Sequence, residues 1–293
     1  MPTRSRTASG RVLSKTDVAV VTEAAPAKIN LALHVRRRRA DGYHDIETLF
    51  AFLSDGDVLT VADDERDSFA ITGPFAAGLS GEGANLVTSA RGAFAAAFGP
   101  VEPLSITLDK RLPIASGIGG GSADAAAMLR VLARRRGIGS DDPALLACAA
   151  RLGADVPACL LGRTAFGTGT GTDLKPLDGL TGTPVLLINP GVAISTVEVF
   201  RGWDGIDRGG LAADDPLARA GRNDLEPAAR RIAPAIHGAL RALAGAPGVT
   251  LSRMSGSGAT CFALFENEDA RSSAARAIRA DRPDWWLLES VLA

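Results

Sequence analysis

Apolar and polar residues alternate most regularly over residues 28–35, KINLALHV, near the start of the chain. A period of two is typical of a strand with one apolar face. That face would begin at Ile29, and the opposite face would carry Lys28 and Asn30, because residues two apart point the same way along a strand. The pattern therefore predicts a lysine and an asparagine side by side on one face of a strand.

The same patterns predict strands and helices along the rest of the chain. Alternating or short apolar runs bounded by turn residues predict strands at 57–63, 68–73, 104–110, 184–191, on both sides of a glycine loop within 249–265, and near 285–293. Helical spacing and alanine-rich composition predict helices at 85–98, from Ser122 to Arg136, at 143–152, at 225–245 with a break near Pro234, and at 268–280. Mixed strands and helices of this kind predict an α/β (α+β) fold.

The length of 293 residues is comfortable for two domains. Residues 167–182, GTGTGTDLKPLDGLTG, are rich in glycine and threonine and indicate a domain boundary. We expect a disordered extension over 1–18, an N-terminal domain over 19–170, a linker over 171–182 and a C-terminal α+β domain over 183–293.

Composition narrows the classes of function. A net charge of −1 gives no sign of a nucleic-acid or membrane partner, and no apolar run approaches the ~20 residues of a membrane-spanning helix. The polar N-terminus lacks the apolar stretch of a signal peptide, and three widely spaced cysteines suit a reducing compartment. We therefore expect a cytoplasmic protein.

The basic residues are strongly biased, because 32 arginines and lysines include only four lysines: Lys15, Lys28, Lys110 and Lys175. A lysine retained in such a chain is of interest as a place where a compact ammonium is needed.

A glycine cluster at Gly117–Gly121 stands directly before the helix predicted from Ser122. Free N–H groups and the helix dipole make such a loop an anion site, and glycine lets a phosphate approach the backbone. The spacing excludes a P-loop, which needs a lysine here, and a dinucleotide fingerprint, whose third glycine is replaced by Ser122. A tight packing turn is the structural alternative, and Ser122 would serve as an N-cap or as a contact to phosphate or Mg²⁺.

Three motifs in this order resemble those of the kinase superfamily named for galactokinase, homoserine kinase, mevalonate kinase and phosphomevalonate kinase. They are APAKIN at 25–30, PIASGIGGGSADAA at 113–126 and MSGSGA at 254–259. The resemblance implies a two-domain small-molecule kinase that uses ATP and Mg²⁺. Its N-terminal ATP-binding domain would be ribosomal-protein-S5-like, its C-terminal domain ferredoxin-like, and its active site would lie between them.

Three further stretches resemble one branch of that superfamily: ADGYH at 40–44, LGADVP at 152–157 and NPG at 189–191. That branch phosphorylates the 2-hydroxyl of a diphosphocytidyl methylerythritol, on the methylerythritol phosphate route to isoprenoid precursors. The resemblance thus implies a small-molecule acceptor carrying a cytidine diphosphate group. Sibling kinases of mevalonate or homoserine type, and a non-catalytic nucleotide-binding sensor, remain the alternatives.

The resemblance also assigns roles to particular positions. Lys28 and Asp155 match the catalytic lysine and the catalytic base, and an ammonium near the base would favour its ionised form. The ATP-binding positions are Asn85, Pro113, Ile114, Ala115, Ser116, Gly117, Ile118, Gly119, Gly120, Gly121, Ser122 and Ala123. The acceptor-binding positions are Asn30, Tyr43, His44, Phe50, Thr196, Phe200, Gly256 and Gly258.

Each assignment has a structural alternative. Asp155 would otherwise be an N-cap or turn residue, Lys28 a surface lysine on an edge strand, and Phe50 a core residue. Gly256 and Gly258 would form a tight β-turn. No acidic residue is a firm Mg²⁺ ligand, since Asp124 near Ser122 would equally well cap a helix or face solvent; Ser122 is the one candidate ligand.

Overall fold

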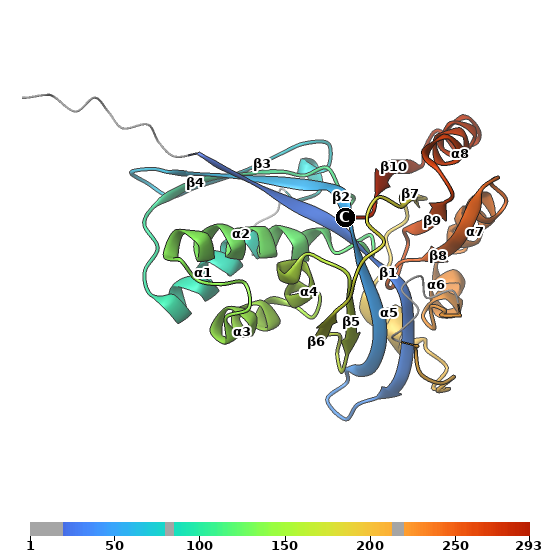
Figure 1. The fold of residues 1–293 in the computed structure, drawn as a ribbon, viewed down its shortest axis with the longest axis horizontal. Coiled ribbons are helices and arrows are strands. Elements are labelled where there is room, and N and C mark those ends of the chain that lie inside the picture. The colour runs from blue at the N-terminus through green and yellow to red at the C-terminus, as the bar shows by residue number, and fades with distance from the viewer. Residues whose placement is uncertain (1–19, 80–84, 213–219) are drawn as a thin grey trace, which may run out of the picture.

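The computed structural model describes residues 20–79, 85–212 and 220–293, so the predicted extension at 1–18 lies outside the described residues. The chain forms two lobes, and the long strands β1 (Val21–Arg38) and β2 (His44–Asp63) run past both of them (Figure 1). These two strands pair antiparallel along their whole length. Register shifts between Pro26 and Lys28, Asn30 and Ala32, and Val35 and Arg37 interrupt the ladder of β1, and irregularities of this kind bend a strand.

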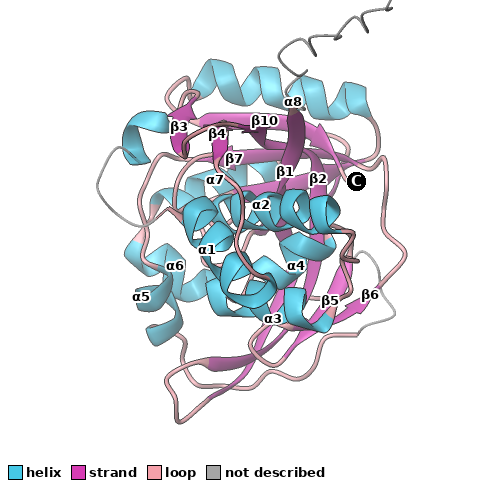
Figure 2. Cartoon of the chain, turned by 90° about the vertical axis from the view of Figure 1, so that its left-hand side faces the viewer, coloured by secondary structure: helices cyan, strands magenta, loops and turns pink. Residues whose placement is uncertain are grey.

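The first lobe is a sheet covered by helices. Its strand order is β3-β4-β2-β5-β6, with β1 on β2; the remaining strands are β3 (Ser68–Thr72), β4 (Leu104–Asp109), β5 (Ala165–Thr168) and β6 (Asp173–Pro176). Figure 2 shows the helices of this lobe gathered on one face of the sheet. They are α1 (Leu86–Phe98), α2 (Gly120–Arg136), α3 (Pro143–Leu152) and α4 (Val156–Leu161), with a 3₁₀ turn at Ala76–Leu79. Strand β6 lies within the stretch predicted as a linker.

The second lobe is an antiparallel sheet of order β10-β7-β9-β8. Its strands are β7 (Pro184–Asn189), β8 (Val249–Met254), β9 (Cys261–Phe265) and β10 (Trp286–Val291). Its helices are α5 (Thr196–Arg201), α6 (Glu226–Ile232), α7 (Ala235–Ala244) and α8 (Glu268–Asp281). No helix in the described part of the chain is both long and apolar enough to cross a bilayer.

An apolar core joins the two lobes. Ile29 and Leu31 of β1 belong to the same buried cluster as Leu187 of β7 and Phe262 of β9. Because this cluster is continuous, burial of apolar area fixes the second lobe against β1. The groove between the lobes therefore has a defined geometry.

The local predictions agree with most elements, and one face of β1 differs. Helix α2 ends at Gly137, which has the left-handed backbone expected of a C-cap glycine, and Asp142 caps α3. Residues 27–35, however, are buried without a break, so the face that carries Lys28 and Asn30 is buried as well as the apolar face. Helices and the second lobe cover that face, and its polar side chains are held by partners within the protein.

Candidate active site

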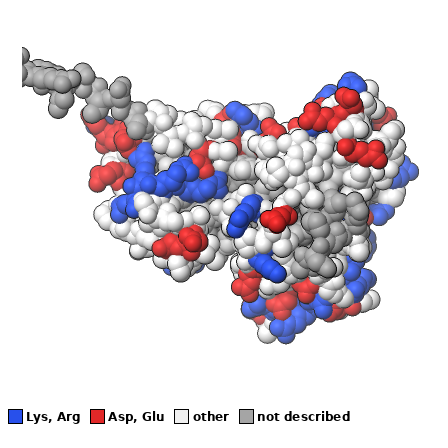
Figure 3. All heavy atoms as spheres, viewed as in Figure 1, with Lys and Arg blue, Asp and Glu red and all other residues white. Residues whose placement is uncertain are grey.

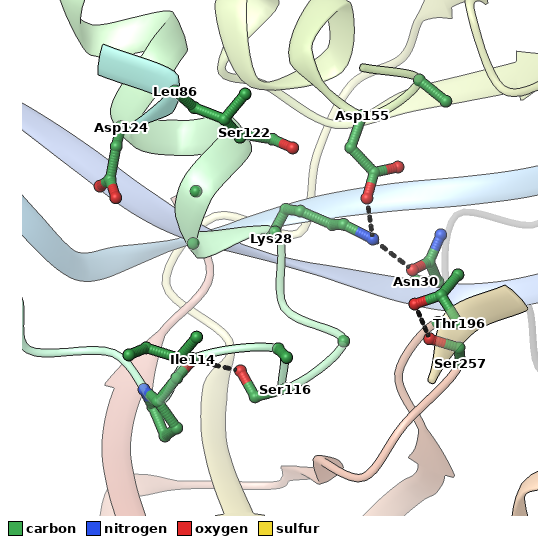
Figure 4. Close-up of a pocket in the computed structure, with 18 of the residues that line it drawn as sticks. Lys28, Asn30, Leu86, Ile114, Ser116, Ser122, Asp124, Asp155, Thr196 and Ser257 are labelled. Carbon is green, nitrogen blue, oxygen red and sulfur yellow. Dashed lines mark hydrogen bonds and ion pairs between the residues drawn. The ribbon is translucent and has the colours of Figure 1, made fainter. Parts of the chain in front are cut away.

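A cavity of about 510 Å³ lies between the lobes and gathers the predicted motifs. Its lining includes Lys28 and Asn30 from β1, the loop from Pro113 to Ser122, and Asp155 before α4. The second lobe adds Thr196 and Phe200 from α5 together with Gly256 (Figure 4). Segments far apart in the sequence thus meet at one site.

Lys28 is at the centre of a polar chain. Its Nζ lies 2.9 Å from Asp155 Oδ2 and donates to Asn30 Oδ1 at 2.8 Å (Figure 4). Asn30 Nδ2 in turn donates to Thr48 Oγ1 at 2.8 Å, and that hydroxyl donates to the carbonyl of Ala32. Lys28 is only 3% exposed, so the alternative of a surface lysine does not hold. The ammonium is fixed between a carboxylate and an amide that point at the cavity.

Asp155 occupies the N-cap position of α4, yet its side chain makes no capping hydrogen bond. The carboxylate reaches Lys28 instead and remains 37% exposed. A capping aspartate would accept from N–H groups of the first helical turn, as Asp142 does at α3. The geometry therefore leaves a free carboxylate oxygen facing the cavity beside an ammonium.

Two glycines of the loop are required by the protein's own packing. Gly119 has φ +66°, and a Cβ there would lie 2.6 Å from Lys28 Cγ. Gly117 has φ +79°, and a Cβ there would lie 2.6 Å from the carbonyl oxygen of Gly258. Lys28 N–H also donates to the carbonyl of Ile118 at 3.0 Å. Glycine here lets the loop lie directly on the lysine stem and on the third motif.

Helix α2 begins at Gly120, with Gly119 as its N-cap, so Ser122 is inside the first turn and the prediction of a start at Ser122 was late. The first N–H that bonds within the helix is that of Ala123, which donates to the carbonyl of Gly119. The N–H groups of Gly120, Gly121 and Ser122 precede it at the positive end of the helix dipole. This turn, which lines the cavity, is suited to an anion.

The third motif, MSGSGA at 254–259, is hydrogen-bonded both to the glycine loop and to β1. Ser255 Oγ accepts from the N–H of Asn30 at 3.2 Å and donates to the carbonyl of Gly117 at 2.9 Å. Gly256 lines the cavity, and a Cβ there would lie 3.0 Å from the same carbonyl. Gly258 packs against Met254, outside the lining. The motif thus connects the phosphate loop to β1 across the two lobes.

The remaining predicted ATP positions divide into lining and core. Asn85 lines the cavity and also caps α1 by accepting from the N–H of Val87 at 2.8 Å. Pro113, Ile114, Ala115 and Ser116 line the cavity too, and Leu79 and Leu86 add apolar surface near them. Ile118 and Ala123 are buried beneath the loop.

A buried ion cluster under the loop was not predicted. Lys110 Nζ lies 2.5 Å from Asp57 Oδ2 and 2.7 Å from Asp124 Oδ2, and a Cβ at Gly120 would lie 3.1 Å from that ammonium. Asp57 also accepts from the N–H groups of Arg111 and Leu112. The scarcity of lysine was a signal for this site, because Lys28 and Lys110 are both buried and ion-paired.

Asp124 neither caps the helix nor faces solvent. Its Oδ2 pairs with Lys110, and its Oδ1 is buried without a hydrogen-bond partner in the described structure. Burial, with the nearby charge of Asp57, raises the pKa of Asp124 to about 7 despite Lys110. This carboxyl therefore sits under the phosphate loop as a buried group that is easily protonated.

Of the residues predicted for the acceptor, Asn30, Thr196, Phe200 and Gly256 line the cavity, and Tyr43 and His44 lie outside its lining. The His44 ring packs on Phe200 with centroids 5.1 Å apart and meets the edge of Trp203, which the sequence did not indicate. Tyr43 is 63% exposed. Thr196 Oγ1 is hydrogen-bonded to Ser257 Oγ at 2.9 Å (Figure 4).

Phe50 lies in the core, outside the cavity lining. Its ring is under Lys28, with Nζ 5.6 Å from the ring centroid. Phe50 therefore contacts Lys28 and is one layer removed from the cavity.

The donor set for Mg²⁺ is sparse. Among the described residues no group of three or more histidine, cysteine or acidic side chains is arranged to hold a metal ion. Of the acidic side chains that line the cavity, Asp155 pairs with Lys28 and Asp124 with Lys110. The Ser122 hydroxyl on the lining fits an ion that keeps nucleotide phosphates and water as its other ligands.

Comparison with known proteins agrees with this geometry. Residues 74–163 match the GHMP kinases N terminal domain, and residues 211–284 match the GHMP kinases C terminal domain. A 4-diphosphocytidyl-2-C-methyl-D-erythritol kinase of Rhizorhabdus wittichii is 55% identical over 277 residues, covering 92% of this chain and 94% of the relative. The corresponding kinase of Novosphingobium aromaticivorans is 48% identical, covering 92% of each chain.

Solved structures of kinases share the fold of this chain. A crystal structure of 4-(cytidine 5'-diphospho)-2C-methyl-D-erythritol kinase is 36% identical, with a TM-score of 0.76 over 93% of this chain and 99% of that one. A homoserine kinase of Cytophaga hutchinsonii, 19% identical, shares the fold with a TM-score of 0.71 over 97% of each chain. The expected two-domain kinase fold is thereby confirmed. The chain belongs to the 4-diphosphocytidyl-2-C-methyl-D-erythritol kinase family of the GHMP kinases.

Proposed function

We propose that this chain transfers the γ-phosphoryl group of ATP to the 2-hydroxyl of 4-diphosphocytidyl-2-C-methyl-D-erythritol, giving ADP and the 2-phosphate. The pair of Lys28 and Asp155, 2.9 Å apart beside the glycine loop, is the observation that carries this proposal. It supplies a cation and a free carboxylate at one end of an anion site. The reaction is a step of the methylerythritol phosphate route to isoprenoid precursors.

The chemistry follows from positioning and charge. The N–H groups at the start of α2 hold the phosphates, so the γ-phosphorus is presented toward Lys28 and Asp155. The acceptor oxygen forms a bond to that phosphorus while the bond to the ADP oxygen breaks, and the hydroxyl proton passes to Asp155. Lys28 offsets negative charge that develops between the two oxygens. Mg²⁺, held by the nucleotide phosphates and Ser122, would supply further charge neutralisation.

The side of the cavity lined by helix α5 supports a cytidine diphosphate acceptor. His44, Phe200 and Trp203 form an aromatic cluster in which the His44 ring is tilted on Phe200 and meets Trp203 edge-on; Phe200 lines the cavity, and Tyr43 lies exposed on the adjoining turn. Rings of this kind suit a nucleobase, whereas mevalonate or homoserine has no group to fill them. Two measurements separate a cytidine acceptor from mevalonate or homoserine. CMP and CDP should inhibit competitively against a cytidine acceptor, and mevalonate and homoserine should not be phosphorylated in its place.

The experiment that tests the catalytic assignment is Asp155→Asn. Turnover should fall roughly 10²–10⁴-fold, the usual contribution of a general base, while nucleotide binding persists. ADP release in a coupled assay measures the first quantity, and ATP titration measures the second. Asp142→Asn is the matched control, because asparagine caps a helix as well as aspartate does and Asp142 lies outside the cavity lining. Near-normal turnover of Asp155→Asn would remove Asp155 from this role.

The proposal includes the cytoplasm as the compartment. Cys148, Cys159 and Cys261 are all free and buried, which suits a reducing environment.

A further inference from the structure

Four consecutive arginines, residues 36–39, end strand β1 and begin the hairpin turn. Figure 3 shows basic and acidic side chains mixed over this end of the hairpin, at the bottom of the view. Arg36, Arg37 and Arg39 each form an ion pair with a carboxylate. Within the described ranges, Arg38 has no carboxylate within 4.0 Å of its guanidinium. Arg38 therefore differs from its three neighbours in having no ion pair within these ranges.

Arg38 bridges strand β2 and helix α5, which carry His44 and Phe200 of the aromatic cluster. Its Nε donates to His44 Nε2 at 3.3 Å, and its Nη2 donates to the carbonyl of Arg201 at 3.2 Å. His44 is the first residue of β2 and the direct cross-strand partner of Arg38. Arg201 is the last residue of α5 and follows Phe200. One guanidinium therefore joins a strand of the first lobe to a helix of the second, beside the contact of His44 with Phe200.

The bond to His44 Nε2 decides which ring nitrogen carries the proton. A guanidinium has donors only, so Nε2 must be the acceptor and the neutral ring must be protonated at Nδ1. Burial and the positive charge of Arg38 lower the pKa of His44, which keeps the ring neutral near pH 7. In the described structure Nδ1 has no hydrogen-bond partner. The ring thus keeps one N–H donor without a partner, next to Phe200, which lines the cavity.

We propose that Arg38 is a positioning residue for base recognition: it fixes the His44 tautomer with Nδ1–H as a donor and holds that ring against Phe200. The role in recognition rests on the proposed function. A fixed donor matches the N3 acceptor of a cytosine, whereas the N3–H group of a uracil would face it donor to donor. Arg38 acts through His44 and contributes to the preference for a cytidine acceptor over a uridine one.

The first test measures the tautomer in the free enzyme, without any substrate. The full chain is labelled with ¹⁵N-histidine, and its three histidines are resolved by NMR, with His44→Asn identifying the His44 signals. The expected result is a protonated Nδ1 and an unprotonated Nε2 in the wild type. In Arg38→Met the two nitrogens should show averaged protonation. A wild-type ring protonated at Nε2 would overturn the proposal.

The second test separates acceptor binding from catalysis. Arg38→Met should raise the KM for the cytidine acceptor about tenfold or more, because a charge-assisted hydrogen bond is lost, with the KM for ATP unchanged. The ratio of inhibition by CMP to inhibition by UMP should fall. Arg37→Met is the matched control, since Arg37 is 74% exposed, pairs with Asp45, and contacts neither His44 nor α5.

The outcomes distinguish this proposal from the proposed function. An unchanged acceptor KM in Arg38→Met, or an equal change in Arg37→Met, would overturn the role of Arg38 while turnover by the wild type persists. A wild type that phosphorylates no cytidine acceptor would instead refute the proposed function, and the tautomer measurement would still report on Arg38.

Discussion

Gly119→Ala tests the idea that the glycine loop and Lys28, the proposed catalytic lysine, form one packed unit. Gly119 and Gly137 flank helix α2 as its N-cap and C-cap and have nearly the same backbone, φ +66° and ψ +20° against φ +66° and ψ +26°. A left-handed alanine costs roughly 1–2 kcal/mol at either position. The two sites therefore carry equal backbone strain, and they differ in what an added methyl group meets.

At Gly137 a Cβ would meet nothing within 4 Å. At Gly119 it would lie 2.6 Å from Lys28 Cγ, 3.0 Å from Cε and 3.4 Å from Cδ, where ordinary contact begins at 3.4 Å. The buried lysine stem or the loop must then move by about 0.8 Å at the nearest atom. Nζ is held at 2.8–2.9 Å by Asn30 and Asp155, so this movement disturbs the pair of Lys28 and Asp155. A misplacement near 1 Å can reduce turnover by about 10²-fold.

The assay compares kcat for ADP release with the free energy of unfolding in urea for both variants. Gly137→Ala should lose about 1–2 kcal/mol of stability and keep its turnover. Gly119→Ala should lose at least as much stability and about 10²-fold in kcat. Turnover within about threefold of wild type in Gly119→Ala, or equal losses of turnover in both variants, would refute the packing argument.

Three further expectations concern groups around the cavity. Because burial raises the pKa of Asp124 to about 7, the unfolded chain releases this proton at lower pH than the folded chain does. The wild type should therefore lose stability relative to Asp124→Asn as pH rises from about 4 to about 7, by up to roughly 4 kcal/mol in urea titrations; a difference independent of pH would contradict this. Ser255→Ala should lower stability by roughly 1–3 kcal/mol and raise the KM for ATP, since Asn30 N–H and the Gly117 carbonyl lose their partner; unchanged values of both would contradict it. Burial raises the pKa of the Cys159 thiol to about 12, so iodoacetamide at neutral pH should leave activity intact, and rapid inactivation would show that the thiol is accessible.

The motifs predicted the site better than the periodicity predicted the strands. Lys28, Asp155 and the glycine loop were placed together by the resemblance of their motifs, and the structure brings them within a few ångströms. Strand β2, by contrast, begins at His44 and not at residue 57. Its early part is held by pairing with β1, a long-range interaction that no local pattern encodes.

Which polar side chains are buried could not be predicted from the local sequence. The burial of the polar face of β1 could not be predicted, because its partners Thr48 and Ser255 are distant in the sequence. Asp124 was weighed as a metal ligand or a cap for the same reason, since its pairing with Lys110, the residue after β4, depends on how α2 packs against the sheet. Trp203 follows the short helix α5 three residues after Phe200, and its contact with His44 depends on how α5 lies beside β2.

The number of residues between two side chains of β1 limits how this enzyme can be altered. Lys28 and Arg38 belong to one strand, so inserting or deleting a single residue between them would turn one of these side chains to the opposite face. The turn at residues 39–43 lies beyond both side chains and is exposed, so its length can change without that reversal. A library aimed at new acceptors should therefore vary the turn and the side chains around His44, and keep the length of the strand constant.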